Sequence, residues 1–439
     1  MAATRGVPDV LVVGAGLAGL ACAHDLARAG FGVRVLEASD GVGGRMRSDR
    51  HEGFVLDRGF QVFNTSYPQV RRRLPLRELR LRPFTPGFLV HTDDGVLRFA
   101  DPTRKPHRLG DLRPGRFAGG RDLLALGALS ARDMVAPVRS PARGDDRTTR
   151  TELADAGFSE EFVERFFRPF LSGVFLEDEL ETSSRFFHLV WRSMLRGTLC
   201  LPSEGIGAVP RLLAAALPPE VVRLDTPVAR LTDTGVALTG GGELPARAVV
   251  VATGPVQAAA LLPGLEVPAC RVVTTYYHAA TRSPLPEPTL LTDVRRRFLN
   301  TCVLSEVVPG YAPAGRALIA TSVLGDDREG RENEVRGALS EAYGTDAGAW
   351  QLLRARTVPD ALPAMPPPHP LSRTPRFAPG RYVCGDHRAT GSVQGALASG
   401  ARADRPWRRV RAGMTTATPP KDDPGPRVSP RARARRAAT

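Results

Sequence analysis

Lysine is nearly missing from this chain. Only Lys105 and Lys421 occur among the 439 residues, and arginine supplies the remainder of the 60 basic side chains. Since so strong a preference for arginine reflects codon composition as readily as function, the net charge of +14 does not by itself define a partner.

Cysteine pairs and long apolar runs are missing as well. The five cysteines lie far apart without a C-x-x-C pair, which argues against a disulfide framework, a metal site or a redox dithiol. The nearest candidate for a membrane span, residues 248–265, is interrupted by Pro255, Gln257 and Pro263. There is also no internal repeat, P-loop, Ser-His-Asp order or H-E-x-x-H motif.

The N-terminus imitates a secretory signal, because Arg5 and an apolar stretch precede Ala21-Cys22-Ala23. Cleavage there would remove the first predicted strand and three glycines, so we expect the segment to be retained. The predicted location is therefore cytoplasmic, with a peripheral membrane contact left open and no transmembrane segment.

The stretch from Val10 to Glu37 has the pattern of a nucleotide-binding βαβ unit. Val10–Val13 is a continuous apolar run, typical of a buried parallel strand. Leu17–Ala29 is apolar enough to be the crossover helix, and Val33–Glu37 follows as the second strand. Glu37 comes 18 residues after Gly19, close to the spacing of a carboxylate that binds a ribose 2′-hydroxyl, and it would repel the 2′-phosphate of NADP.

Three glycines form a G-x-G-x-x-G motif between the first strand and the helix. Gly14 allows the tight turn, Gly16 lets backbone N–H groups approach a pyrophosphate, and Gly19 lets the helix pack closely on the strand. Leu17 and Ala18 lie in the same turn, where the helix N-terminus adds partial positive charge. We expect the whole turn to bind a dinucleotide.

A second glycine signal follows in Gly43-Gly44-Arg45. The glycines let the backbone lie close to a flat or phosphorylated ligand, and Arg45 supplies a fixed charge for phosphate. The two signals together resemble the N-terminal signature of the flavin-dependent superfamily of amine oxidases, phytoene desaturases and protoporphyrinogen oxidases. That resemblance implies FAD as the cofactor, with Gly44 and Arg45 among its ligands.

The far end of the chain resembles the second FAD segment of that family. In Arg381–Ser399 a short strand ends in Gly385-Asp386, and a helix begins near Gly391-Ser392. By resemblance, Asp386 binds the ribityl–pyrophosphate side and the first helical turn lies beside the isoalloxazine, where N–H groups stabilise the charge of reduced flavin. The predicted contacts at this end are Gly385, Asp386, Ser392, Val393 and Ala396.

Three middle segments resemble the family too. Val222–Leu231 is similar to the strand pair over the adenine, with Val228 as a backbone contact. Ala248–Thr253 is typical of the next buried strand, and Asp57–Gln61 is similar to the loop that returns under the flavin. The predicted contacts in that loop are Gly59, Phe60 and Gln61.

The predicted fold class is α/β: a doubly wound, Rossmann-like FAD-binding domain with a discontinuous, mixed α+β substrate domain. The FAD-binding domain would comprise residues 1–66, 200–268 and 370–403, and the substrate domain residues 67–199 and 269–369. Residues 404–439 would form a disordered basic tail, since ten basic and two acidic residues from Arg405 onward leave a charge of +8. We expect a solvated appendage, with no nucleic-acid partner.

The predicted substrate domain opens with six arginines and continues into helical and strand patterns. Thr151–Ala156, Ser159–Leu171 and Phe186–Leu195 are typical of helices, with Ser159 as a cap and a stripe of phenylalanines in the core. We expect His188 to be a satisfied, partly buried histidine. Strands are predicted at Val272–Tyr277 and Arg316–Val323. The six arginines are Arg71, Arg72, Arg73, Arg77, Arg80 and Arg82.

The predicted activity is hydride transfer from a C–H (or C–N) bond of an apolar or polycyclic small molecule to flavin, as in desaturases or dehydrogenases. Many amine oxidases of the family place a lysine near flavin N5, and this chain has none between Lys105 and Lys421. The alternatives are an amine oxidase, a polyene isomerase using reduced FAD, and a non-catalytic flavin-binding scaffold. No catalytic acid or base is predicted, and oxygen and quinone both remain open as electron acceptors.

Overall fold

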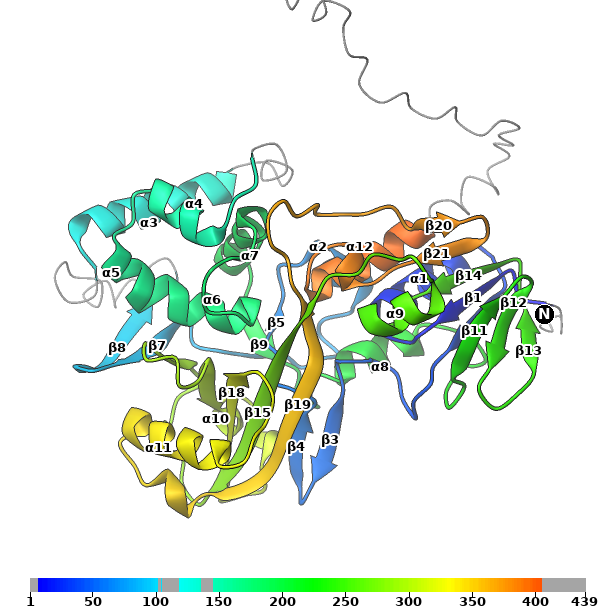
Figure 1. The fold of residues 1–439 in the computed structure, drawn as a ribbon. Coiled ribbons are helices and arrows are strands. Elements are labelled where there is room, and N and C mark those ends of the chain that lie inside the picture. Colours follow the sequence, from blue (N-terminus) through cyan, green and yellow to red (C-terminus); the bar gives the residue numbers. More distant parts are fainter. Residues whose placement is uncertain (1–6, 102–103, 105–117, 136–144, 405–439) are drawn as a thin grey trace, which may run out of the picture. The chain divides into compact units, whose positions relative to one another are not determined.

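Figure 1 shows the computed structural model, which describes residues 7–101, 104, 118–135 and 145–404. The predicted basic tail lies outside the described residues apart from Asp404. Within the described part of the chain, no helix combines the length and the apolar character needed to cross a membrane.

A six-stranded sheet in the order β10-β2-β1-β14-β21-β20 forms the first layer. All neighbours pair in parallel except β20 and β21. The central strands β1 and β14 are buried along their whole length, as continuous apolar runs predict. The strands are β1 (Val10–Val13), β2 (Val33–Leu36), β10 (Val222–Arg223), β14 (Ala248–Val251), β20 (Arg376–Ala378) and β21 (Arg381–Val383).

Different elements cover the two faces of this sheet. The helices α1 (Leu17–Arg28) and α12 (Val393–Ala403) contact each other, and α1 packs on β1 and β2. A Cβ at Gly400 of α12 would lie 2.1 Å from the Ala18 carbonyl oxygen, so the two helices meet backbone to backbone. On the other face, Leu11 and Val13 pack in one apolar cluster with the short helix α9 (Pro255–Leu261) and the sheet β11-β12-β13. Those strands are β11 (Val228–Thr232), β12 (Gly235–Leu238) and β13 (Glu243–Pro245).

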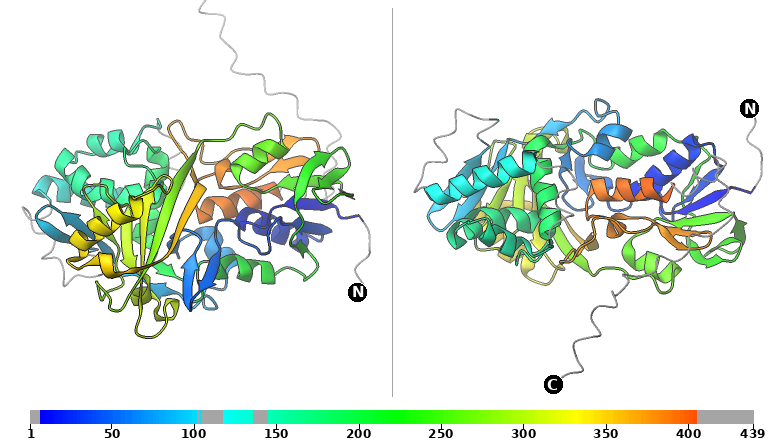
Figure 2. Two further views of the ribbon diagram at one scale, coloured as in Figure 1. Left: turned by 60° about the horizontal axis from the view of Figure 1, so that its bottom comes forward. Right: turned by 90° about the horizontal axis from the view of Figure 1, so that it is seen from above.

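A seven-stranded, mostly antiparallel sheet in the order β19-β15-β18-β17-β16-β7-β8 forms the second layer (Figure 2). The strand predicted at 272–277 lies within β15, and the strand predicted at 316–323 begins one residue before β18. The helix α11 (Arg331–Tyr343) packs on one face of this sheet. The strands are β7 (Gly87–Thr92), β8 (Gly95–Ala100), β15 (Cys270–Ala280), β16 (Leu291–Asp293), β17 (Asn300–Val303), β18 (Ala317–Leu324) and β19 (Gln351–Pro363).

A group of helices packs beside β7 and β8 around an aromatic core (Figure 1). The Ser159 hydroxyl accepts a hydrogen bond from the Phe162 N–H at 3.2 Å, which confirms the predicted cap. The predicted phenylalanine stripe is buried core: Phe162, Phe166, Phe167 and Phe170 are all at most 7% exposed. The helices are α3 (Gly120–Val135), α4 (Thr149–Asp155), α5 (Glu160–Phe162), α6 (Arg168–Phe175) and α7 (Ser184–Arg196).

The predicted continuous helix at Ser159–Leu171 is wrong in one respect. A π-helical turn, Val163–Phe167, separates α5 from α6. Pro169 lacks an N–H and its ring would clash with the carbonyl of Arg165 in a regular α-helix, which explains a wider turn just before it.

His188 on α7 is a satisfied, partly buried histidine, as predicted. Its Nδ1 lies 2.9 Å from Asp133 on α3, and its Nε2 lies 3.0 Å from Glu152 on α4. Burial opposes the charged ring, but the two carboxylates raise the pKa of His188 above its ordinary value. The His188 ring therefore joins the three helices α3, α4 and α7.

The remaining short elements connect the two large sheets. The hairpin of β3 (Ser48–His51) and β4 (Phe54–Asp57) precedes the sheet β5-β9-β6. Its members are β5 (Phe63–Asn64), β6 (Arg82–Pro83) and β9 (Leu199–Leu201), and the helix α8 (Ala208–Ala215) follows.

One short helix lies on the side of the predicted FAD-binding domain, although its residues fall in the predicted substrate segment. The helix α2 (Pro68–Arg73) contacts α12, and Arg73 donates to Asp25 of α1 at 2.9 Å. The side chains of Arg73 and Asp25 are 2% and 6% exposed, so the ion pair is internal. The domain boundaries, including the one between residues 66 and 67, stay predictions.

Candidate functional site

The turn between β1 and α1 leaves open space beside one of its glycines. Gly14 has φ +103°, and a Cβ on Gly19 would lie 2.0 Å from the Gly14 carbonyl oxygen, so both positions require glycine. By contrast, a Cβ on Gly16 would meet no atom within 4 Å. The turn is therefore tightly packed at Gly14 and Gly19 and has open space beside Gly16.

The N-terminus of α1 borders this opening and has no side-chain cap. Gly16 provides no side-chain cap, and the first turn contains no acidic residue. The first α-helical hydrogen bond runs from the Leu20 N–H to the Gly16 carbonyl, which leaves the N–H groups of Leu17, Ala18 and Gly19 outside the helical ladder. A pyrophosphate fits such a cradle in both charge and space.

Glu37 follows β2 and lies beside the same turn. Its carboxylate accepts hydrogen bonds from the Ala15 N–H at 2.7 Å and from the Ser39 N–H and hydroxyl at 3.0 and 2.8 Å. These donors hold the carboxylate at the carboxyl end of β2, where its remaining lone pairs can accept hydroxyl donors. Such an arrangement suits a ribose.

The second glycine signal folds directly onto the first. Gly43 forms a parallel bridge with Gly16, and the Gly43 N–H donates to the Ala15 carbonyl at 2.9 Å. A Cβ on Gly44 would lie 3.7 Å from the Gly16 Cα. The two glycine signals therefore border the same open space.

Arg45 and Asp386, separated by 341 residues, form one ion pair. The Arg45 Nη2 lies 2.7 Å from both carboxylate oxygens, and its Nη1 donates to the Ala361 carbonyl at 2.9 Å. The side chain of Arg45 is 33% exposed and that of Asp386 only 7%. Burial alone would lower the pKa of the guanidinium, but the Asp386 carboxylate raises it above its ordinary value.

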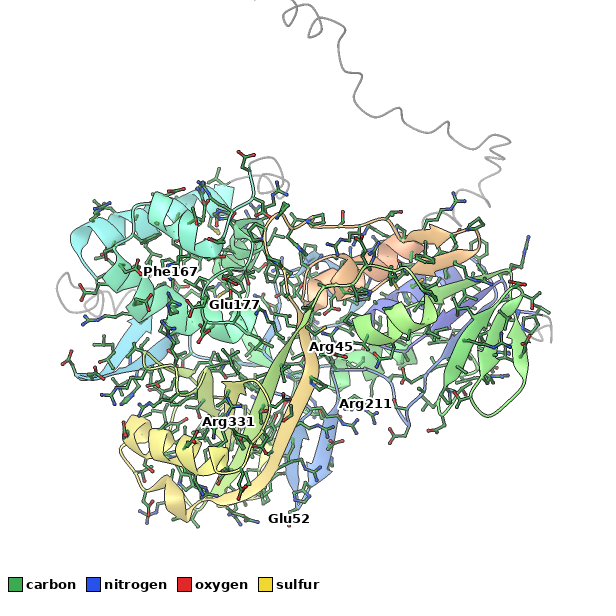
Figure 3. All side chains as sticks on the ribbon, viewed as in Figure 1. Arg45, Glu52, Phe167, Glu177, Arg211 and Arg331 are labelled. Carbon is green, nitrogen blue, oxygen red and sulfur yellow. The ribbon has the colours of Figure 1, made fainter. Side chains whose placement is uncertain are left out.

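Figure 3 shows Arg45 near the carboxyl end of β19, close to where the two large sheets meet. Sequence reasoning assigned Arg45 and Asp386 separate roles toward the cofactor and did not predict that they contact each other. The Gln61 side chain donates to the Arg45 carbonyl at 2.9 Å, which brings the predicted flavin loop to the same place.

The start of α12 is capped by a side chain. The Ser392 hydroxyl accepts from the Gly395 N–H at 3.0 Å, and the Ala396 N–H donates to the Ser392 carbonyl at 2.9 Å. Because Val393 and Gln394 precede these partners, their N–H groups are outside the helical ladder. At the preceding strand end, the Gly385 N–H donates to the Ser399 hydroxyl at 3.1 Å.

The end of β19 completes this region and was missed by sequence reasoning. The Gly391 N–H points at the Met365 sulfur at 3.2 Å, and a Cβ on Gly391 would lie 2.8 Å from a Leu362 methyl group. The only signal in the sequence is the run of prolines and small residues after Leu362, which has no spacing that points to a site.

The predicted flavin loop rests on a buried carboxyl group. Asp57 accepts from the Ser48 hydroxyl at 2.5 Å and the Ile206 N–H at 2.9 Å. Burial raises the pKa of Asp57 to about 6 despite these two hydrogen bonds. Two residues later, Gly59 has φ +93°, and the Phe60 N–H donates to the Thr275 hydroxyl at 3.3 Å. The loop thus joins the hairpin to β15.

The segment Val222–Leu231 is not one strand pair. β10 joins the six-stranded sheet, whereas β11 begins at Val228 and pairs with β12. Asp225, with φ +49°, turns the chain between them, and the Thr226 N–H donates to the Glu37 carbonyl at 2.8 Å. The turn residue therefore lies at the Glu37 end of the site, and Val228 stays a predicted contact two residues further along.

A parallel sheet, an open glycine turn and a carboxylate after the second strand define a dinucleotide-binding α/β protein. The family model "Flavin containing amine oxidoreductase" matches residues 17–403. The chain belongs to this family, whose members are FAD-dependent oxidoreductases, and the predicted fold class, family and cofactor are confirmed.

Among curated relatives, hydroxysqualene dehydroxylase of Rhodopseudomonas palustris is 29% identical, with 90% of this chain and 97% of that protein aligned. Phytoene desaturase of Cercospora nicotianae is 33% identical over 22% of this chain and 16% of that protein. An L-amino-acid oxidase of Crotalus adamanteus is 40% identical over 19% of this chain and 16% of that protein. The latter two alignments therefore span about a sixth of the relatives' lengths.

Solved structures share the fold along nearly the whole chain. Cyclohexylamine oxidase from Brevibacterium oxydans has a TM-score of 0.69 and 18% identity, covering 93% of this chain and all of that chain. A putative protoporphyrinogen oxidase from Exiguobacterium has a TM-score of 0.67 and 18% identity, covering 91% and 98%. At such identities the likeness concerns the fold alone.

Proposed function

We propose that the protein is an FAD-dependent dehydrogenase or desaturase that takes a hydride from a C–H bond of an apolar small molecule. The observation that carries this proposal is the lack of any lysine between Lys105 and Lys421, which removes the side chain that many amine oxidases of the family place near the flavin. The relative aligned over nearly its full length, hydroxysqualene dehydroxylase, supports an apolar substrate.

The proposed adenosine end of the cofactor site comprises Glu37 for the ribose and the Gly14–Gly19 turn for the pyrophosphate. The N–H groups at the start of α1 support this assignment, since they lie outside the helical ladder and no side-chain cap competes with an anion for them. Arg45 adds the fixed positive charge, and the backbone of Val228 stays assigned to the adenine.

The proposed flavin end comprises Asp386, the Gly59–Gln61 loop and the first turn of α12, whereas Gly44 borders Gly16 and is assigned to the pyrophosphate. When bound, FAD supplies the electron-accepting chemistry. The N–H groups of Val393 and Gln394, which lie outside the helical ladder at the start of α12, would stabilise the charge that develops there. Leu362 and Met365 pack at the same helix start, where they would exclude water from the reacting atoms. No side chain is assigned as acid or base.

Anaerobic flavin bleaching tests this proposal. The purified chain is mixed under argon with an apolar polyene or allylic alcohol, or with primary and secondary amines, and its visible spectrum is followed. We expect bleaching by members of the apolar set alone. Steady peroxide release with an amine in air would overturn the proposal in favour of amine oxidation, whereas isomerisation without net reduction would indicate a polyene isomerase.

A further inference from the structure

A run of arginines beside the proposed flavin end has no role in the site described above. Residues 71–82, which comprise the second half of α2, the following turn and the start of β6, contain six arginines and one glutamate. Two of the arginines are neutralised, since Arg73 pairs with Asp25 and Arg80 pairs with Glu204.

The other four arginines form what we call the arginine surface: Arg71, Arg72, Arg77 and Arg82 are all exposed. Arg71 donates to the Thr65 carbonyl, and no carboxylate in the described part of the chain forms an ion pair with any of the four. Glu78 is exposed among them, so the unpaired groups of these twelve residues carry a net charge of +3, from four positive and one negative side chain (4 − 1), and the like charges repel one another. An unpaired cluster of this kind is typical of a surface that receives an anion.

Apolar residues are interleaved with these charges. Pro75 and Pro83 are exposed, and Leu76 and Leu81 are half-buried, so that apolar groups alternate with guanidinium groups along the segment. A lipid bilayer presents the matching chemistry, because phosphate headgroups lie directly above an acyl layer. The surface of an acidic protein or a nucleic acid would match the charges but not the prolines and leucines between them.

The arginine surface starts beside the helix that begins at the proposed flavin end. In α2 the Gln69 N–H donates to the Gln394 side chain on the first turn of α12 at 2.9 Å, and Arg71 and Arg72 follow within one turn of Gln69. Figure 2 shows α2 alongside α12 in the view from above. Docking through these arginines would therefore bring the flavin end close to the surface that is bound.

We propose that the arginine surface docks the protein on an anionic lipid bilayer. Arginine near an anionic leaflet strengthens binding by about fivefold for each residue, so four residues provide reversible attachment at physiological ionic strength. The further point that the bilayer would also hold the substrate rests on the proposed function, whereas the docking itself does not.

Vesicle flotation of the full chain tests the proposal. The probes are vesicles of phosphatidylcholine with and without phosphatidylglycerol, and the variant is Arg72→Gln/Arg77→Gln/Arg82→Gln. We expect wild-type protein to float only with the anionic vesicles, and the variant to bind about a hundredfold more weakly. The Lys version of the same triple variant should retain most of the binding, because a bilayer requires the charge rather than the guanidinium shape.

A matched control separates this surface from net charge and from the basic residues after Arg405. Arg28→Gln/Arg282→Gln/Arg376→Gln removes the same charge from exposed arginines for which no ion pair is found within the described residues. It should bind vesicles as the wild type does. Equal losses in both triple variants, or wild-type binding by the first variant, would overturn the proposal. A lack of binding of the full chain to anionic vesicles would also overturn the proposal, and it would favour an acidic protein as the partner of the arginine surface.

Flotation involves no turnover, so its failure and that of the proposed function are independent. Unchanged flavin absorbance in every variant shows that the nucleotide site is intact, since none of the substituted residues belongs to it.

Discussion

The helices α1 and α12 both begin at the proposed cofactor site, but they begin differently. α1 starts at Gly16 with no cap, whereas α12 starts at Ser392, whose hydroxyl caps the Gly395 N–H. A pyrophosphate carries a full negative charge and satisfies several N–H donors at once, so a protein cap would compete with it. A flavin ring in its oxidised state is neutral and leaves room for a cap. The difference therefore reflects the charge that each helix end is expected to face.

Filling the open space at α1 should give the largest effect. Gly16 has an extended backbone with φ −71°, which valine adopts readily, and a Cβ at this position would have no atom within 4 Å. We expect Gly16→Val to fold and to purify without flavin, measured by the absorbance ratio of flavin to protein. Gly127→Val in α3, where a Cβ also meets nothing, is the control and should keep its flavin. A yellow Gly16→Val protein would show that the site is misplaced.

Breaking the ion pair between Arg45 and Asp386 should have the next largest effect. Arg45→Gln leaves the Asp386 carboxylate 7% exposed without its cation. Losing one partner of a fully buried pair costs about 3–5 kcal/mol, and the partial exposure of Arg45 reduces the expected loss in unfolding free energy to about 2 kcal/mol.

Denaturant unfolding of Arg45→Gln, Asp386→Asn and the double variant measures this coupling. The double variant should be more stable than Arg45→Gln alone, because it leaves no unpaired charge. Additive losses would contradict a direct interaction.

Removing the cap of α12 should have a smaller effect. Ser392→Ala leaves the Gly395 N–H without its acceptor and should lower the unfolding free energy by about 1 kcal/mol. Ser392→Thr, which retains a hydroxyl, is the matched control. Flavin should remain bound in both, as judged by fluorescence of the protein-free filtrate. Ser392 is also a predicted cofactor contact, so complete flavin loss in Ser392→Ala would show that its hydroxyl is required for binding as well as for the cap, and would break the distinction between the two helix ends.

The titration of His188, within the group of helices beside β7 and β8, should have the smallest effect. The pKa of His188 is raised in the folded state, so its contribution to stability is complete below the ordinary value of 6.5 and is lost as pH rises through the higher folded value. Thermal melting of the wild type should show this loss, and His188→Gln should not. Flavin content should be constant across the same pH range, and a parallel change in both would connect the helical layer to the cofactor site.

Local signals explain what the sequence could predict. The apolar run at β1, the glycine turn and the length of α1 are each determined within a few residues, and their predicted bounds agree with the structure to one residue. The Ser159 cap is also determined within a few residues, because the hydroxyl accepts from the N–H of Phe162. The π-helical turn was missed because Pro169 acts on a carbonyl one turn earlier, which a periodic pattern does not register.

Contacts between distant segments explain what the sequence could not predict. The pairing of Arg45 with Asp386 and the contact of Met365 with Gly391 depend on how β19 passes from one sheet toward the other. Likewise, the division of Val222–Leu231 between two sheets depends on one turn at Asp225, a residue type that is common in many loops.

The strand order has a consequence for how the chain is made. β1 pairs with β14, whose residues are synthesised more than two hundred positions later. β14 in turn pairs with β21, which is synthesised later still. Until then the edge of β1 is an exposed template for wrong pairing. Since α12 is the last described element and closes directly on Ala18, the first glycine motif emerges from the ribosome long before its partner. We therefore expect stalled nascent chains to bind FAD only once α12 has left the exit tunnel.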